Sequence, residues 1–357
     1  MKRKAIVTIT DGISPTSMPF NEFMLYRLKK YPDEKQILVQ VFEKGIDKNV
    51  TIPNEVDFYS LGMSLRKVMQ TIRSIEKEYD VNAFHIHEGK SVILFSVSTL
   101  LTRRSKTIYT LHSTYRNYPF HNKLFSFCAS LLAKKVVCVS ETSYKYYPKI
   151  LKTLRGKNAM SIQNGVDTDR IDAVDCNGIK PNAQFTMMYV ARLVPLKRHY
   201  ILFEALTELP DVKLILIGQG PLQEDLKNLA REKGIENQVD FKGLLPREKV
   251  YRSLMEADLY VSTSSYEGLP IGVLEAMGCG TACLVTNIEQ HEEIAVKCPS
   301  LMTLPPDAKL WAKKIKELQS LSKNEMSSIG AENKKQVYEN FSLMRMHENY
   351  NKLYEAE

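Results

Sequence analysis

The sequence predicts an α/β fold built from two doubly wound, parallel-sheet domains. A chain of 357 residues suits one large or two medium domains. Short β-branched runs alternate with longer helical patterns, which is typical of βαβ units. The alternation stops in a polar segment at residues 167–184 and then resumes. With 44% apolar and 25% charged residues, the composition excludes a disordered, collagen-like or coiled-coil protein.

Ten strands are expected, five before the polar segment and five after it. They fall at residues 5–10, 37–42, 83–87, 107–111, 135–139, 185–191, 213–217, 239–242, 259–262 and 282–285. Residues 1–170 would form the first domain and residues 171–340 the second. Open α/β sheets bind ligands beyond the carboxyl ends of their strands, so the function is expected in a cleft between the two domains.

Two features bear on the location of the chain. The longest apolar run, residues 91–102, is too short to span a bilayer, and the N-terminus lacks the apolar block of a secretion signal. Six scattered cysteines without Cys-x-x-Cys spacing argue against a disulfide framework or a zinc ribbon. We therefore expect a cytoplasmic chain with buried thiols.

The net charge of +8 is concentrated in the first half. Residues 1–175 contain 27 Lys and Arg against 17 Asp and Glu, whereas residues 176–357 contain 22 against 24. The first half could therefore meet an anionic partner. A generally basic surface that maintains solubility explains the same numbers.

The most informative segment runs from Ser264 to Met277, directly after an expected strand. Its Pro270 suits the start of a helix, and Gly268 and Gly272 permit close approach of a ligand to the backbone. Free N–H groups and the helix dipole would favour a bound anion such as a diphosphate. Glu267 and Glu275 could accept hydrogen bonds from the vicinal hydroxyls of a ribose and a sugar. The alternative is a pair of carboxylates on a solvated helix face.

Two cations follow the first strand of the second half. Arg192 and Lys197 stand five residues apart on a strand-to-helix loop, where they could hold a diphosphate and neutralise its charge as it leaves. Standing alone, they would be ordinary solvated loop cations.

Together these segments resemble the nucleotide-sugar half of retaining glycosyltransferases of the GT-B fold, family 4. Glu267 and Glu275 match the family's Glu-x7-Glu motif, and Arg192 and Lys197 match its phosphate-binding pair. Further matches lie at residues 164–167, 217–221 and 241–243, and residues 341–357 resemble a closing helix that returns to the first domain. The resemblance covers most of residues 80–357.

The resemblance implies a role for each matched residue. Glu275 would bind the donor ribose, Glu267 would face the transferred sugar, and Arg192 and Lys197 would hold the diphosphate. Gly218 and Leu244 would lie near the base. The turn formed by Gly268, Leu269, Pro270, Ile271, Gly272 and Val273 would face the phosphates and contribute backbone N–H groups, of which Pro270 has none.

The first half resembles the family less closely. His112 ends an expected strand and resembles the acceptor-side histidine that touches the donor sugar at the reaction centre. The first loop lacks the Gly-Gly pair of many members, and Ser14, Thr16 and Ser17 are the acceptor-side candidates there. Hydroxyls at these positions could still bind a phosphate.

Three other patterns have simpler interpretations. His85 and His87 share one face of a strand, but no third ligand accompanies them, so no metal is expected. The triplet at residues 167–169 has the Asp-x-Asp form of metal-dependent GT-A transferases, but we interpret it as a solvated turn. Residues 218–220 form only a fragment of a dinucleotide fingerprint.

One helical pattern in the first half stays open between two interpretations. The stripe of Leu124, Phe127, Cys128, Leu131 and Leu132 fits core packing. It also fits a surface helix that rests, with nearby lysines and arginines, on anionic lipid.

The resemblance implies transfer of a sugar from a nucleoside diphosphate sugar, with UDP favoured, to a hydroxyl acceptor with retention of configuration. The acceptor would be a lipid-linked or cell-surface glycan precursor, and the enzyme would sit on the inner face of the plasma membrane. No cofactor and no nucleic-acid partner are expected. The alternatives are an epimerase or phosphorylase of the same fold, and a nucleotide-sugar-binding protein without transfer activity.

Overall fold

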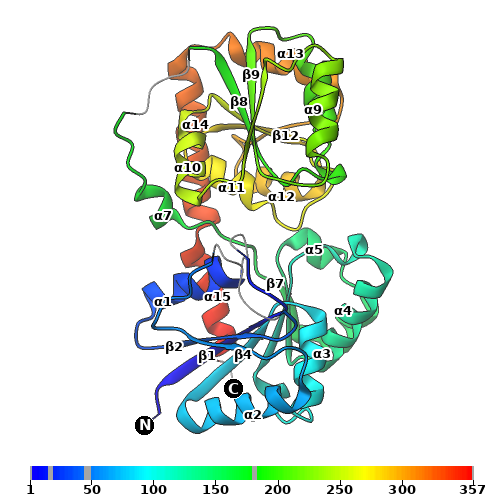
Figure 1. Cartoon of the computed structure of the whole chain (residues 1–357), viewed down its shortest axis with the longest axis vertical. Coiled ribbons are helices and arrows are strands. Elements are labelled where there is room, and N and C mark those ends of the chain that lie inside the picture. Colours follow the sequence, from blue (N-terminus) through cyan, green and yellow to red (C-terminus); the bar gives the residue numbers. More distant parts are fainter. Residues whose placement is uncertain (1, 15–18, 44–49, 179–182, 356–357) are drawn as a thin grey trace. The chain divides into compact units, whose positions relative to one another are not determined.

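The computed structural model describes residues 2–14, 19–43, 50–178 and 183–355, and Figure 1 traces the chain. The chain divides into two compact units. The first comprises Met1–Asn164 and Leu343–Glu357, and the second comprises Gly165–Ser342. The division precedes the expected domain end at residue 170. Segment 165–170 lies with the second unit because the Val166 N–H donates to Phe341 O at 2.8 Å and Ile171 is buried in that unit's core.

Among its described residues, the first unit has one parallel sheet of seven strands, in the order β3-β2-β1-β4-β5-β6-β7. The strands are β1 (Lys4–Thr10), β2 (Lys35–Gln40), β3 (Asp57–Ser60), β4 (Asp80–Ile86), β5 (Thr107–Leu111), β6 (Lys135–Cys138) and β7 (Ala159–Ser161). Successive residues of β1 point to opposite faces: Val7 packs in one core and Ile6 in another. The sheet is therefore covered on both sides, as parallel sheets usually are.

Helices cover both faces of this sheet (Figure 1). The main helices are α1 (Tyr26–Lys30), α2 (Leu65–Glu78), α3 (Gly89–Ser98), α4 (Phe120–Leu132), α5 (Glu141–Lys145), α6 (Lys149–Arg155) and α15 (Leu343–Tyr354), and the short turns are η1 (Pro19–Leu25), η2 (Arg104–Lys106), η3 (Tyr115–Asn117) and η4 (Gly156–Asn158). Helices α2 and α3 share a core with Val7, whereas α15 shares the core of Ile6. Tyr354 of α15 is bonded to His85 of β4 at 2.7 Å.

The second unit has a six-stranded parallel sheet in its described part, in the order β10-β9-β8-β11-β12-β13, around one apolar core. Its strands are β8 (Phe185–Val190), β9 (Val212–Ile217), β10 (Val239–Gly243), β11 (Leu259–Ser262), β12 (Ala282–Thr286) and β13 (Met302–Leu304). Its helices are α7 (Thr168–Asp172), η5 (Pro195–Lys197), α8 (Tyr200–Leu206), α9 (Gln223–Glu232), α10 (Arg247–Glu256), α11 (Ile271–Gly278), α12 (Glu289–Lys297), α13 (Ala308–Gln319) and α14 (Lys323–Asn340).

Strand order reverses once in each sheet, between β1 and β4 and between β8 and β11. At such a switch point the two following connections leave in opposite directions and open a crevice outside the carboxyl ends of the strands. The loops after β8 and β11 carry the cations and the glutamates that the sequence singled out. The loops after β1 and β4 carry the acceptor-side candidates and His87.

All ten expected strands are confirmed within a few residues. Three strands were not predicted: β3, β7 and β13, each three or four residues long and each at an edge of its sheet. Such short runs carry little periodicity, and pairing with a single neighbour creates them.

Two other expectations were wrong. Cys176 is exposed rather than buried. The triplet at residues 167–169 is not a solvated turn, because Asp167 caps α7 by accepting a hydrogen bond from the Arg170 N–H at 3.1 Å. None of the described helices is long and apolar enough to cross a membrane.

The glycine pair between α11 and α14 generates a prediction. Gly330 of α14 lies against the carbonyl of Gly280, so a Cβ at residue 330 would clash with backbone. We expect Gly330→Ala to destabilise the protein by about 1–3 kcal/mol through overpacking, although alanine is intrinsically the better helix former by about 1 kcal/mol. Urea unfolding should show this loss. Ser328→Ala, on the exposed face of α14, is the control, and equal stabilities of the two variants would contradict the prediction.

Candidate functional site

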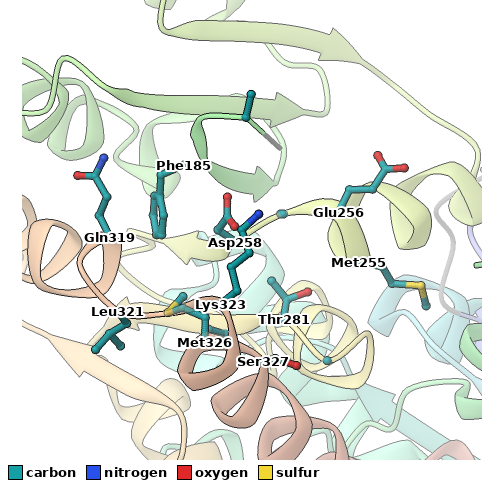
Figure 2. A pocket seen from close by; sticks show the side chains of 14 residues that line it. Phe185, Met255, Glu256, Asp258, Thr281, Gln319, Leu321, Lys323, Met326 and Ser327 are labelled. Carbon is teal, nitrogen blue, oxygen red and sulfur yellow. The ribbon is translucent and has the colours of Figure 1, made fainter. Parts of the chain in front are cut away.

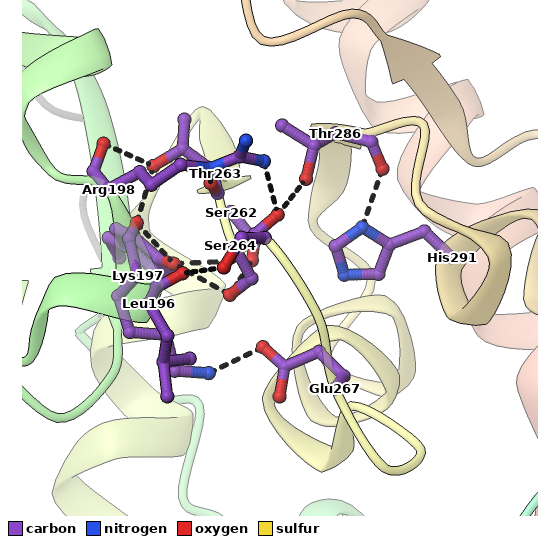
Figure 3. Close-up of polar contacts among 11 residues, drawn as sticks. Leu196, Lys197, Arg198, Ser262, Thr263, Ser264, Glu267, Thr286 and His291 are labelled. Atoms are coloured by element: carbon purple, nitrogen blue, oxygen red, sulfur yellow. Dashed lines mark hydrogen bonds and ion pairs between the residues drawn. The ribbon is translucent and has the colours of Figure 1, made fainter. Parts of the chain in front are cut away.

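The loops after β8 and β11 are joined by backbone and side-chain hydrogen bonds (Figure 3). The Ser265 N–H donates to Leu196 O at 2.8 Å, and the Thr263 hydroxyl donates to Lys197 O, also at 2.8 Å. The Tyr189 hydroxyl donates to the same Lys197 carbonyl at 3.2 Å. These bonds hold the two loops that carry the candidate residues in one fixed arrangement.

Arg198 contributes most to this junction. Its guanidinium donates to Thr263 O at 2.8 Å and to Ser264 O at 2.7 Å, as Figure 3 shows. Its φ of 46° lies in the left-handed region, which costs a non-glycine residue about 1–2 kcal/mol. Hydrogen bonds from a charged donor offset this strain. Sequence analysis missed Arg198, because nothing in the local pattern reveals its left-handed conformation or its partners.

Lys197 and Glu267 form an ion pair across the junction, with 2.5 Å between Nζ and Oε1. The two side chains are only 18% and 15% exposed. Burial lowers the pKa of Lys197, but the neighbouring Glu267 carboxylate outweighs this effect and the pKa is raised. The ammonium group therefore stays charged. Arg192 is exposed, and its positive charge also acts on Lys197.

Glu275 lies one turn inside α11 and is buried. Its Oε1 accepts a hydrogen bond from the Tyr251 hydroxyl at 2.9 Å and lies 3.5 Å from the Arg247 guanidinium. Both donors stand four residues apart on α10, and therefore on one helix face. This i, i+4 spacing was a usable signal, but sequence analysis did not connect α10 with Glu275. Glu275 is not on a solvated helix face.

The turn before α11 differs in one detail from the expectation. Pro270 is the N-cap residue, and Ile271 is the first helical residue. A proline side chain cannot hydrogen-bond to the first N–H groups of the helix. Leu269, Pro270 and Val273 are buried, whereas Gly268, Ile271 and Gly272 are partly exposed. A Cβ at Gly272 would crowd the Tyr260 hydroxyl.

Glycines bring the loop after β9 against the Arg192 loop. A Cβ at Gly218 would clash with the carbonyl of Ala191, and one at Gly220 would clash with the backbone of Leu193. The Leu193 N–H donates to Gln219 O at 3.0 Å, and the Gly218 N–H donates to Gly243 O at 2.8 Å. Leu244 directly follows Gly243, the last residue of β10, and is 59% exposed. The predicted donor-side residues thus all lie in the second unit, on adjoining loops and in the first turns of α11.

Two histidines meet at the carboxyl edge of the first sheet. His87 follows β4 and His112 follows the neighbouring β5, with 2.8 Å between His87 Nδ1 and His112 Nε2. Burial lowers the pKa of His112 to about 4 and that of His87 well below its ordinary value, so both rings are neutral. His87 Nε2 is buried without a partner. An unpaired lone pair is more tolerable there than an unpaired N–H. This favours a proton on His87 Nδ1, which leaves His112 to donate from Nδ1.

Acidic residues occupy the same edge beside the first loop. Glu88 accepts hydrogen bonds from the Asp11 N–H at 3.1 Å and the Thr10 hydroxyl at 3.2 Å, and Ser91 donates to Asp11. Burial and the Asp11 carboxyl raise the pKa of Glu88 to about 8. Sequence analysis missed both acids. Of the acceptor-side candidates, Ser14 is partly exposed, and Thr16 and Ser17 lie outside the described residues.

The other histidine of β4 has a structural role. His85 is bonded on both ring nitrogens, to Tyr354 and to Thr110, each at 2.7 Å. His85 and His87 share one face of the strand as expected, with ring centroids 4.2 Å apart. Within the described residues, no group of three or more His, Cys, Asp or Glu side chains could hold a metal ion.

A pocket of about 530 Å³ lies elsewhere in the second unit. Figure 2 shows Phe185, Asp258 and Thr281 on its wall. These residues stand at the amino ends of β8, β11 and β12, so the pocket opens at the sheet edge opposite the Lys197–Glu267 pair. The Asp258 carboxylate is already bonded to the Thr186 N–H at 2.8 Å.

Comparison with known proteins identifies the family. Residues 177–336 match the family described as "Glycosyl transferases group 1", and residues 32–170 match "Glycosyltransferase Family 4". The chain belongs to glycosyltransferase family 4.

Two curated relatives illustrate the similarity. A phosphatidylinositol N-acetylglucosaminyltransferase subunit of Arabidopsis thaliana is 24% identical over 62% of this chain. The Escherichia coli UDP-Gal:α-D-GlcNAc-diphosphoundecaprenol α-1,3-galactosyltransferase is 27% identical over 64% of this chain. The chain spans 51% of the plant relative's length and 63% of the bacterial relative's length.

Solved structures share the fold along the whole chain. Sucrose-phosphate synthase from Thermosynechococcus elongatus has a TM-score of 0.80 at 16% identity, covering 99% of this chain and 100% of that chain. Anabaena HepE, in complex with UDP and glucose, has a TM-score of 0.77 at 20% identity, covering 100% of both chains. The family 4 chain therefore has the GT-B fold.

The loop junction generates a stability prediction. Arg198→Ala removes two hydrogen bonds from a charged donor, each contributing about 1.5–3 kcal/mol, so urea unfolding should show a loss of a few kcal/mol. Arg198→Gly removes the same bonds and also the left-handed strain, so it should be the more stable variant by about 1 kcal/mol. Arg231→Ala, at an exposed position on α9, is the control. Native-like stability of Arg198→Ala would show that its bonds do not hold the loops.

Glu88 generates a prediction about pH. Its folded pKa of about 8 exceeds the ordinary value of 4.5. The stability contributed by neutral Glu88 is therefore fully present below pH 4.5 and is lost as the pH rises through 8. Glu88→Gln does not titrate. We expect the melting temperature of the variant to rise relative to the native protein between pH 6 and pH 9, and a constant difference would contradict this.

Proposed function

We propose that this chain transfers a sugar from a nucleoside diphosphate sugar, preferably a UDP-sugar, to a hydroxyl acceptor with retention of anomeric configuration. The observation that carries the proposal is the partly buried Lys197–Glu267 ion pair, which is held at the second switch point beside the N-terminus of α11. Withdrawing two charges from water costs free energy, and charged groups in such a setting are frequent at functional sites. The structures of Anabaena HepE in complex with UDP and with UDP-glucose support the choice of UDP.

The donor nucleotide would bind through Glu275 and the glycine loops. Tyr251 and Arg247 both reach Oε1 of Glu275, so Oε2 can accept a hydrogen bond from a ribose hydroxyl. The anchored Oε1 fixes the carboxylate before the ligand arrives, which reduces the ordering cost of binding. Gly218 and Leu244 would lie along the base.

Leaving-group stabilisation would be the main catalytic contribution. The diphosphate gains charge as the glycosidic bond breaks, and groups that already point at that charge lower the barrier. Arg192 and Lys197 would supply two positive charges on one side. The backbone N–H groups of the turn that begins at Gly268, together with the dipole of α11, would supply partial positive charge on the other. The Val273 N–H would not take part, because it donates to Pro270 O at 3.1 Å.

Glu267 and His112 would act at the transferred sugar. Glu267 would face the reacting carbon, either as the nucleophile or as a charge that steadies an oxocarbenium-like centre. In a front-face reaction, by contrast, the departing phosphate takes the acceptor's proton. The neutral His112 would donate from Nδ1 to a sugar hydroxyl, with His87 fixing its tautomer.

The acceptor is proposed to be a lipid-linked or cell-surface glycan precursor. The names of the two curated relatives include a phosphatidylinositol and a diphosphoundecaprenol acceptor. The basic first half suits such an anionic substrate. The enzyme would accordingly work as a cytoplasmic, peripheral protein on the inner face of an anionic membrane.

Donor binding tests the proposal directly. UDP-, GDP- and ADP-sugars should be screened by thermal shift, because a ligand raises the melting temperature by mass action. We expect UDP-sugars to give the largest shift. Calorimetry should then show that Glu275→Ala weakens UDP binding by about 1–3 kcal/mol, the cost of leaving polar partners unpaired. Glu224→Ala is the control, because the Glu224 side chain is 72% exposed on α9.

The outcomes separate the candidate functions. Unchanged affinity in Glu275→Ala would remove that residue from the ribose site. Release of an epimerised nucleotide sugar, or a requirement for inorganic phosphate, would favour an epimerase or a phosphorylase. UDP-sugar binding with no turnover over a broad acceptor panel would favour a binding protein.

A further inference from the structure

Helix α4 presents three of its large apolar side chains, Phe120, Leu124 and Leu131, to solvent. Phe120, Leu124, Phe127 and Leu131 form one stripe at the spacing i, i+4, i+7, i+11. Phe120 is 84% exposed, Leu124 56% and Leu131 38%. The buried residues of α4 are instead Ser126, Ala129 and Ser130. The core-packing interpretation is therefore wrong for Leu124 and Leu131. Phe127 and Leu132 do pack against the core of the first unit.

Helix α6 extends this apolar surface. Ile150 and Leu154 stand four residues apart on α6 and are 60% and 62% exposed. The α6 helix packs beside α4, and the guanidinium of Arg155 donates to the carbonyl of Ala133, directly after α4, at 2.5 Å. The exposed side chains of the two helices thus belong to neighbouring elements.

The end of α3 adds two exposed leucines. Leu100 is 76% exposed and Leu101 48%, and α3 packs against α4 (Figure 1). Arg104 donates to Leu131 O at 3.1 Å, which ties this turn to the end of α4. Both leucines have positive φ values, 50° and 58°. The backbone therefore accepts strain in a turn that leaves two large apolar side chains in water.

Positive charge is concentrated in the same segment. From residue 89 to residue 158 the chain has 13 Lys and Arg residues and a single acidic residue, Glu141. Exposed cations flank the apolar side chains at Arg104, Lys106, Lys134, Lys145, Lys149 and Lys157. An exposed apolar patch surrounded by cations suits a partner with an anionic surface and an apolar interior.

We infer that this α3–α4–α6 face, defined by Leu100, Leu101, Phe120, Leu124, Leu131, Ile150 and Leu154 with their flanking cations, docks on an anionic lipid bilayer. The apolar side chains enter the boundary between headgroups and acyl chains, and the cations meet lipid phosphates. A nucleic acid would satisfy the charges but not the apolar side chains. The inference rests on the proposed function and deepens it by naming the surface that docks, and it would place the first unit where a lipid-linked acceptor is presented.

The test measures sedimentation of the full chain with vesicles. Neutral vesicles of phosphatidylcholine are compared with anionic vesicles in which about one lipid in three is phosphatidylglycerol. Both are tested at low and at high salt. We expect strong binding to the anionic vesicles only. Leu124→Gln/Ile150→Gln, which keeps every charge, should weaken this binding at least about tenfold. Val296→Gln, at an 82% exposed position on α12 of the second unit, should bind like the native chain.

Three results would overturn the inference. Equal binding to neutral and anionic vesicles would remove the role of charge. Native binding by Leu124→Gln/Ile150→Gln would remove the apolar insertion. Tighter binding of the native chain to an oligonucleotide than to anionic vesicles, unaffected by the double variant, would assign the surface to nucleic acid.

UDP binding by calorimetry keeps this inference separate from the proposed function. The double variant changes only exposed side chains of the first unit, so it should bind UDP like the native chain. Failure of the native chain to bind any nucleotide would overturn the proposed function but leave the vesicle result intact. A double variant that loses both UDP and vesicle binding would be misfolded. In that case the single variants Leu124→Ser and Ile150→Ser are tested instead. Loss of vesicle binding with retained UDP binding would support the inference. Native vesicle binding would overturn it.

Discussion

The candidate site depends on a charged pair that is taken out of water. Lys197 and Glu267 lie on different loops, and the Glu267 carboxylate stabilises the charged form of Lys197 in a setting that would otherwise disfavour it. Removal of Glu267 would take this carboxylate away from a partly buried ammonium group. The surrounding structure therefore has to keep the two loops together. Arg198 does so from one side, and the glycines at 218 and 220 allow the third loop to approach from the other.

The two sheets use the same edge for different chemistry. The carboxyl edge of the second sheet combines Arg192, Lys197 and a helix N-terminus, which together suit a phosphate. The edge of the first sheet combines neutral imidazoles with carboxyl groups whose pKa values are raised by burial. Neutral donors and acceptors suit hydroxyl groups rather than a phosphate. Asp11 stands at the start of the first loop, which lacks the Gly-Gly pair of many family members.

The strands and the charged motifs could be predicted from the sequence because each depends on residues that are neighbours along the chain. Alternation of side chains marks a strand, and the turn from Glu267 to Glu275 has its chemistry in consecutive residues. Sequence analysis missed Tyr251 and Arg247, because their relation to Glu275 exists only once α10 packs beside α11. It left the stripe on α4 open between two interpretations, since periodicity shows that a helix has an apolar face but not which face meets the sheet.

The sequence by itself determined the α/β class, ten of the strands and the residues that give the second unit its charge pattern, because hydrophobic period and residue chemistry are properties of neighbours along the chain. Only the tertiary structure decided that Lys197 pairs with Glu267, that His112 meets His87, and that Ser126 rather than Leu124 faces the core. Each of these outcomes brings together groups from different elements or chooses between two faces of one helix. Packing makes that choice, by burying the set of side chains that fits the space beside the sheet.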